Sequence, residues 1–142
     1  MNFSLPEFLP YLLNQAAEAV SKDFQTYYRD RYGMLRTEWR VLFHLGCYGD
    51  MTAKRICHLA SIHKTKVSRA VSALEAKRYL AKETNESDRR IENLSLTGLG
   101  RQVFQDLSTA AERYENKIAR ALTDDECAQL RLSLAKLANQ KF

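Results

Sequence analysis

Apolar residues recur along most of the chain at the three- and four-residue spacing of helices, and only one short region departs from it. The first helical pattern begins at Pro6 and Pro10, where proline is tolerated, and extends to Tyr32. Gly33 is suited to end this helix, because glycine readily takes the left-handed backbone of a C-terminal cap. The same spacing predicts further helices over about residues 37–46, 52–60, 64–79, 97–122 and 123–137.

Threonines stand where four of these helices are expected to begin, namely at Thr37, Thr52, Thr97 and Thr123. A threonine hydroxyl accepts a hydrogen bond from a free amide of the first helical turn, so each residue is predicted to cap its helix. Glu126 follows Thr123 by three positions, which is the spacing of a reciprocal capping box.

The region that departs from helical spacing is predicted to form a β-hairpin. Residues 80–84 and 91–96 have the short, bounded pattern of strands, and residues 85–90 form a polar turn between them. The fold class is therefore mainly α with a small β-hairpin wing. A helix, a short turn, a second helix and a hairpin, in that order, are typical of a winged helix-turn-helix.

The helix before the hairpin has the surface expected of a recognition helix. Val67, Val71 and Leu74 fall at i, i+4 and i+7 and define one buried stripe. The outward positions carry short hydroxyls and cations, which reach bases and phosphates without filling a major groove. These predicted DNA-binding residues are Lys64, Thr65, Lys66, Ser68, Arg69 and Ser72.

The hairpin turn carries a second candidate contact, Asp88-Arg89-Arg90. Asp88 is expected to hold the turn by accepting bonds from backbone amides or from an adjacent arginine. One guanidinium would then be free to enter a narrow, electronegative minor groove. The structural alternative is that the cations of helix and turn only solvate the surface.

Charge supports the same segment. The 142-residue chain has a net charge of +5, and residues 50–96 hold ten Lys/Arg against six Asp/Glu, a difference of +4. Apolar residues make up 45% of the chain, enough for the core of one domain. No apolar run approaches the roughly 20 residues that span a bilayer, and no signal peptide is evident, so a cytoplasmic protein without a membrane partner is expected.

Four motifs in this order resemble the MarR family of bacterial transcription regulators, and the resemblance covers almost the whole chain. They are residues 37–42 (TEWRVL), 64–69 (KTKVSR) with 74–80 (LEAKRYL), 88–90 (DRR) and 96–100 (LTGLG). Two positions depart from the family pattern: Tyr79 stands where glycine is common, and His63 stands where an acidic residue is commoner.

The resemblance implies a single domain over residues 1–142, with residues 35–97 as the DNA-binding lobe and residues 1–34 and 98–142 as dimerisation helices. It also implies a homodimeric repressor on an inverted-repeat operator in double-stranded DNA. Release by a small phenolic or aromatic effector is a further implication. Either Arg89 or Arg90 would be the wing arginine.

An effector site would require apolar walls and a partner for a carboxylate. The candidate residues are Tyr11, Phe24, Tyr28, Trp39, Arg40 and Phe43. Helical aromatic stripes also form plain core or dimer interfaces, and Arg40 is equally suited to a surface salt bridge. Both interpretations stay open at the level of sequence.

Other chemistry is poorly supported. The histidines and the three cysteines, Cys47, Cys57 and Cys127, have no metal-ligand spacing, so neither metal nor cofactor is expected. Cys47 and Cys57 are expected to be small core residues. Enzymatic activity is not expected, because the chain has no phosphate-binding loop, nucleophile elbow or paired-carboxylate motif.

Alternative functions remain. A winged-helix module that binds an acidic protein is one, and DNA-binding regulators without an effector or under cysteine redox control are the others.

Overall fold

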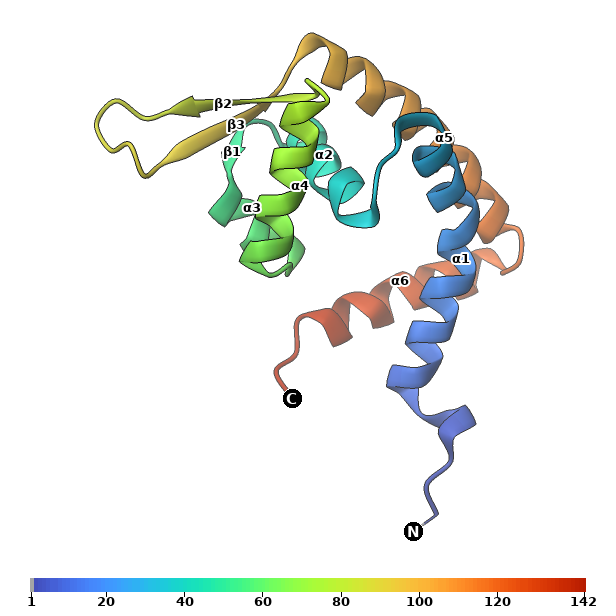
Figure 1. The fold of residues 1–142 in the computed structure, drawn as a ribbon. Helices are drawn as coiled ribbons and strands as arrows, with labels where there is room; N and C mark the ends of the chain where they lie inside the picture. The colour runs from blue at the N-terminus through green and yellow to red at the C-terminus, as the bar shows by residue number, and fades with distance from the viewer. Residues whose placement is uncertain (1) are drawn as a thin grey trace.

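The structure, a computed structural model, describes residues 2–142, which form one 3-10 helix, six α-helices and a three-stranded sheet (Figure 1). None of the helices within this range is long and apolar enough to cross a membrane. The elements are η1 (Leu5–Glu7), α1 (Leu9–Tyr32), α2 (Arg36–Tyr48), β1 (Met51–Thr52), α3 (Ala53–Ala60), α4 (Lys64–Ala76), β2 (Leu80–Thr84), β3 (Glu92–Leu96), α5 (Gly98–Ala119) and α6 (Asp124–Ala138).

The sheet confirms the predicted hairpin and adds a strand to it. β2 and β3 pair antiparallel from Leu80↔Leu96 to Thr84↔Glu92, and β1 pairs with the other edge of β3. β1 has only two residues, which is too short for an alternating pattern to be visible in the sequence. It ties the start of α3 to the base of the wing through the Met51↔Leu94 pair.

The main core lies where α2, α3 and α4 pack on one another and on the sheet. The predicted stripe of α4 is confirmed, because Val67, Val71 and Leu74 are all buried. Leu42 of α2 and Leu94 of β3 lie in the same core. Burial of this one face leaves the opposite face of α4 in solvent.

Three of the four predicted threonine caps are confirmed. The hydroxyls of Thr52, Thr97 and Thr123 each accept from the amide three residues on, at 3.0–3.2 Å. The cap at Thr37 is wrong, because α2 begins at Arg36 and Thr37 lies inside its first turn. The Glu38 carboxylate instead accepts a hydrogen bond from the amide of Leu35, at 2.9 Å.

The predicted end of α4 at about residue 79 is also wrong, since the helix ends at Ala76. The amide of Tyr79 bonds back to the carbonyl of Leu74 at 2.9 Å, which closes the helix as a Schellman-type cap. Arg78 has the left-handed backbone of this cap, with φ of 64°. The position that favours glycine is therefore Arg78 rather than Tyr79.

α1 and α5 lie side by side (Figure 1) and are joined by a polar hub at Asp106 of α5. The Asp106 carboxylate accepts bonds from the hydroxyls of Tyr32 and of Tyr27, the latter at 3.0 Å, and lies 3.4 Å from Arg31 Nε. The bond from Tyr32 holds the pKa of Asp106 below its ordinary value. Burial is the main cause that raises the pKa of Tyr32 to about 12, and the hydrogen bond to Asp106 is the second.

The start of α5 lies against the backbone that leaves α4. A Cβ built on Gly100 would stand 1.8 Å from the carbonyl oxygen of Tyr79, whereas one on Gly98 would have nothing within 4 Å. Only glycine at residue 100 allows this close approach.

We therefore expect Gly100→Ala to lower the stability of the fold, because the new methyl group forces α5 away from the α4–β2 corner. The expected cost is about 1–3 kcal/mol, the range of overpacked sites. Thermal unfolding measures it, and Gly98→Ala is the matched control. Equal melting temperatures for the two variants would contradict the close approach.

The Asp106 hub gives a second expectation. Because the folded pKa of Asp106 is depressed, its stabilisation is full above the pKa of an unfolded aspartate, about 4, and is lost as pH falls through the folded pKa. Asp106→Asn should cost about 1 kcal/mol at pH 7, because charged hydrogen bonds to a one-third exposed carboxylate are lost.

The difference in melting temperature between wild type and Asp106→Asn should shrink as the pH falls from 4 to 2. Asp50→Asn, at an exposed aspartate outside the ion pairs of residues 2–142, is the control. A difference that is constant with pH would count against the hub.

Candidate nucleic-acid interface

The helix-turn-helix is built from α3, a three-residue turn and α4. Ser61 ends α3 with a left-handed backbone, φ 54°, and Ile62 is buried beneath the turn. His63 then caps α4, its ring Nδ1 accepting from the amide of Thr65 at 3.2 Å. An acceptor at Nδ1 carries no proton, so this cap belongs to the neutral imidazole.

All six predicted residues of α4 are exposed. Thr65, Ser68, Arg69 and Ser72 face away from Val67 and Val71, and Lys64 and Lys66 are exposed in the first turn of the helix. Arg69 lies in the middle of this face and is the only guanidinium on α4. The exposed residues are Lys64, Thr65, Lys66, Ser68, Arg69 and Ser72.

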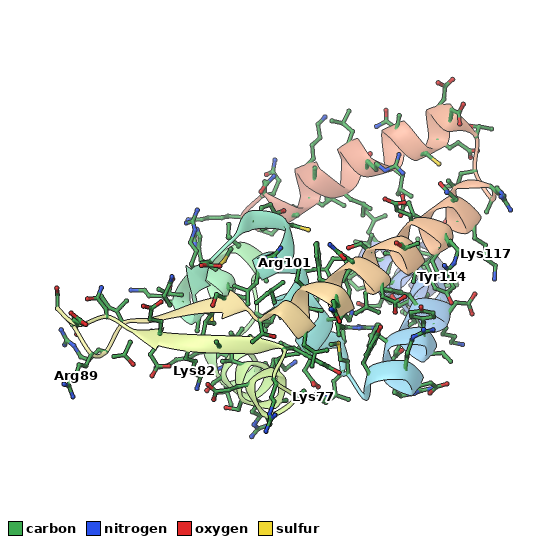
Figure 2. The ribbon with its side chains drawn as sticks, turned by 90° about the horizontal axis from the view of Figure 1, so that it is seen from above. Lys77, Lys82, Arg89, Arg101, Tyr114 and Lys117 are labelled. Carbon is green, nitrogen blue, oxygen red and sulfur yellow. The ribbon has the colours of Figure 1, made fainter. Side chains whose placement is uncertain are left out.

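The wing turn separates the two arginines that the sequence left equivalent. Asp88 accepts from the Arg90 amide at 3.1 Å and from the Arg90 guanidinium at 3.0 and 3.1 Å. These bonds hold the pKa of Asp88 below its usual value. Arg89 takes part in none of the ion pairs of residues 2–142, and it points outward at the tip of the hairpin (Figure 2).

Two further features were not singled out in the sequence. Lys54 and Arg55 are exposed on the first turn of α3. In a helix-turn-helix this first helix crosses the DNA backbone. Lys82 lies 3.6 Å from Glu75 of α4 and 3.9 Å from Glu92 of β3, so it braces the base of the wing against α4. The cap at Thr52 was the one sequence signal that marked the start of α3.

Four of the six proposed effector-site residues come together between α1 and α2. The ring of Phe24 lies 5.3 Å from Tyr28, 5.4 Å from Trp39 and 6.4 Å from Phe43. Tyr28 is buried, whereas the other three are partly buried. Two rings of α5 extend the cluster, with Phe104 at 5.1 Å from Phe43 and Tyr114 at 5.9 Å from Phe24.

The other two proposed residues lie apart from these aromatic contacts. Tyr11 is exposed near the start of α1. Arg40 donates from Nη2 to the carbonyl of Ala60 at 2.8 Å, so it secures the end of α3 to α2. Arg40 belongs to none of the salt bridges within residues 2–142, so the surface salt bridge weighed in the sequence is not the contact it makes.

The cysteines divide between surface and core. Cys47 is exposed, so the expectation that it is a small core residue is wrong. It follows the last buried residue of α2, Leu45, by two positions and so lies on the other side of the helix. Cys57 is partly buried and packs against the core, as expected.

Comparison with known proteins adds independent information. A family model described as MarR family matches residues 32–91, which extend from the end of α1 to the wing. The chain is 25% identical over 127 residues to the uncharacterized HTH-type transcriptional regulator YwaE of Bacillus subtilis, covering 89% of this chain and 74% of YwaE. It is 27% identical to the HTH-type transcriptional repressor MdtR of the same organism, covering 77% of this chain and 70% of MdtR.

Solved structures share the fold over almost the whole chain. A MarR/EmrR family regulator from Acinetobacter sp. ADP1 is 26% identical, with a TM-score of 0.85 and 96% of each chain covered. BpsR of Bordetella bronchiseptica, whose DNA binding is regulated by 6-hydroxynicotinic acid, is 21% identical, with a TM-score of 0.89 over 99% of this chain and 100% of BpsR. NadR, solved with 4-hydroxyphenylacetate, is 20% identical, with a TM-score of 0.81 and 99% of each chain covered.

The motifs of the sequence, the winged helix-turn-helix of the structure and these matches agree. Over its helix-turn-helix and wing the chain matches the MarR family of transcriptional regulators, and solved MarR-family regulators share its fold.

Proposed function

We propose that this regulator is a homodimeric repressor that binds an inverted-repeat operator and is released by a small aromatic acid. The observation that carries the proposal is the exposed, cationic face of α4 beside a wing that presents Arg89 outside the ion pairs of residues 2–142. Both would face one DNA duplex, α4 in the major groove and the wing tip in the minor groove.

On α4, different exposed side chains would contact bases and phosphates. Arg69 has the length and the forked guanidinium for a bidentate contact to guanine, which is worth about 1–3 kcal/mol of base discrimination. Lys64 and Lys66, in the first turn, are suited to phosphates. Thr65, Ser68 and Ser72 are short enough to reach either bases or phosphates.

In the wing, Arg89 is the residue proposed to contact DNA. Arg90 is bonded to Asp88, so that pair is nearly neutral and shapes the turn. Arg89 is the exposed cation that can enter a narrow minor groove, where the negative potential is strongest. Asp88 thus contributes by holding the turn rather than by touching DNA.

The homodimer is proposed from the terminal segments, residues 1–34 and 98–142. No residue of α6 is buried in the single chain, although the helix carries a leucine series. A helix with apolar residues in solvent needs a partner surface, and a second copy of this chain supplies the same exposed side chains. The exposed apolar residues of these segments include Phe8, Leu9, Leu12, Leu13, Leu130, Leu132, Leu134 and Leu137.

An effector would bind where the aromatic cluster joins α1, α2 and α5. Phe24, Trp39 and Phe43 are only partly buried, so their rings can rearrange around an aromatic ligand. The ligands named for BpsR and NadR are aromatic acids, which supports this class. Arg40 would serve the carboxylate only if its bond to Ala60 were released.

Such a ligand would release DNA by favouring a dimer in which the two recognition helices no longer match successive major grooves, about 34–36 Å apart. It does so only to the extent that it binds this form more tightly than the DNA-bound form. Repression, as in MdtR, follows when the operator overlaps a promoter.

The proposal is tested by selecting genomic DNA fragments with the purified full chain at near-physiological salt. We expect enrichment of a short inverted repeat, and a mass of two chains by light scattering. Arg69→Ala should relax preference at one base pair per half-site, by about 10-fold or more. Arg120→Ala, which removes an exposed arginine at the end of α5, is the charge-matched control.

Binding that is salt-sensitive but without sequence preference would contradict the proposed function. Uniform weakening by Arg69→Ala at every base position would contradict the role of that residue alone.

The wing predicts a difference between its two arginines. Arg89→Gln should weaken binding most at sites with A/T-rich flanks and lower the salt slope by about one per protomer, because a cation near phosphates is lost. Replacing the bonded pair, as Asp88→Asn with Arg90→Gln, removes no net charge and should leave the slope nearly unchanged. Titrations of operator DNA across salt concentrations give both slopes, and an unchanged slope for Arg89→Gln would remove the wing from the interface.

A further inference from the structure

The corner between α4 and β2, residues 77–79, is held by contacts with the end of α1, with α2 and with the start of α5. Lys77, just past the end of α4, donates from Nζ to Glu38 Oε1 and to the carbonyl of Gly33, both at 2.8 Å. The other carboxylate oxygen of Glu38 accepts from the amide of Leu35. One lysine therefore joins the end of the recognition helix to the cap of α1 and to the start of α2.

The same corner also contacts α5. The Thr97 hydroxyl donates to the carbonyl of Arg78 at 2.6 Å, and the Thr97 amide donates to the carbonyl of Tyr79 at 3.1 Å. The Tyr79 ring lies edge-on to Tyr32 of α1, 6.3 Å between centroids. α4 thus ends between the last turn of α1 and the first turn of α5, and Asp106 joins those two helices to each other.

The ion pair at this corner is unlike the surface pairs of the protein. The side chain of Glu38 is 5% exposed and that of Lys77 is 29% exposed. The Lys117–Asp23 pair has the same 2.8 Å separation, but its side chains are 69% and 58% exposed (both lysines are labelled in Figure 2). A buried carboxylate depends on its cation far more than a solvated one does, so Lys77 is fixed in place by Glu38.

We propose that Lys77 is a positioning residue for DNA recognition. Its bonds to Glu38 and Gly33 fix the angle at which α4 leaves the α1–α5 frame, and this angle decides whether Arg69 and its neighbours meet base edges. The inference rests on the proposed DNA-binding function. It adds that sequence discrimination depends on an ion pair that touches no DNA.

The geometry gives this pair leverage. Lys77 lies just past the C-terminal end of α4, whereas Thr65 lies at the other end, twelve residues away along a rigid helix. At 1.5 Å per residue that distance is about 18 Å, so a tilt of a few degrees at the corner moves the far end by about 1 Å. Base contacts are lost by such a shift, whereas contacts of flexible lysines with phosphates adapt to it.

The test compares affinity for the selected operator with affinity for a scrambled duplex of the same length. The main variant combines Lys77→Met with Glu38→Gln, which removes the ion pair without leaving a buried charge alone. Its operator-to-scrambled affinity ratio should fall about tenfold, as expected for the loss of about one good base contact. Affinity for the scrambled duplex should change by less than about twofold, because the phosphate contacts are retained.

Three further variants separate positioning from general loss of structure. Lys77→Arg keeps the cation and should retain the ratio within about twofold. Lys117→Met removes the same charge from an exposed ion pair and should leave the ratio unchanged. Glu38→Gln alone, which is nearly isosteric, provides the measurement if the double variant fails to fold by circular dichroism.

An unchanged ratio in the folded double variant, or in Glu38→Gln if only that variant folds, would overturn the inference. So would an equal loss of affinity for operator and scrambled DNA. A wild-type protein that does not distinguish the two duplexes would instead overturn the proposed function, and the inference with it. Failure of the inference is therefore seen in the variants and failure of the proposed function in the wild type, within one experiment.

Discussion

Burial of one face of α4 is the constraint on which the rest of the structure depends. Val67, Val71 and Leu74 enter the core, so Arg69 and the other polar residues of the helix must face solvent. The remaining elements hold that face at a defined angle: α3 and Ile62 at one end, and the Lys77 corner at the other. The exposed polar face that is proposed to read DNA thus follows from ordinary core packing, because only apolar residues of α4 are buried.

Polar contacts in this protein are concentrated where elements meet. Asp106 joins α1 to α5, Glu38 joins α2 to the α4 corner, and Arg40 secures α3 through the carbonyl of Ala60. Lys82 joins the wing to α4 through Glu75. Apolar packing stabilises the lobe but is not directional, whereas these hydrogen bonds and ion pairs require a defined angle and distance. They are suited to transmit a change in the terminal helices to the proposed DNA-binding surface.

Local signals in the sequence predicted local structure well. The α4 stripe, the Gly33 cap and the threonine caps at residues 52, 97 and 123 depend on neighbours within a few positions. Two of the errors lie beside contacts with distant residues. Glu38, held by Lys77, replaced Thr37 at the start of α2, and the backbone at Arg78 turned early to meet α5.

The sequence by itself determined the order of elements, the face that α4 exposes and the resemblance to the MarR family, because periodicity, caps and contiguous motifs are properties of adjacent residues. The folded structure decided which wing arginine stays outside the ion pairs of residues 2–142, since the sequence allowed Asp88 to bond either neighbouring arginine. It alone brought Lys77 to Glu38 and Gly33, more than thirty residues away. Such contacts follow from the packing of whole helices, which no local pattern encodes.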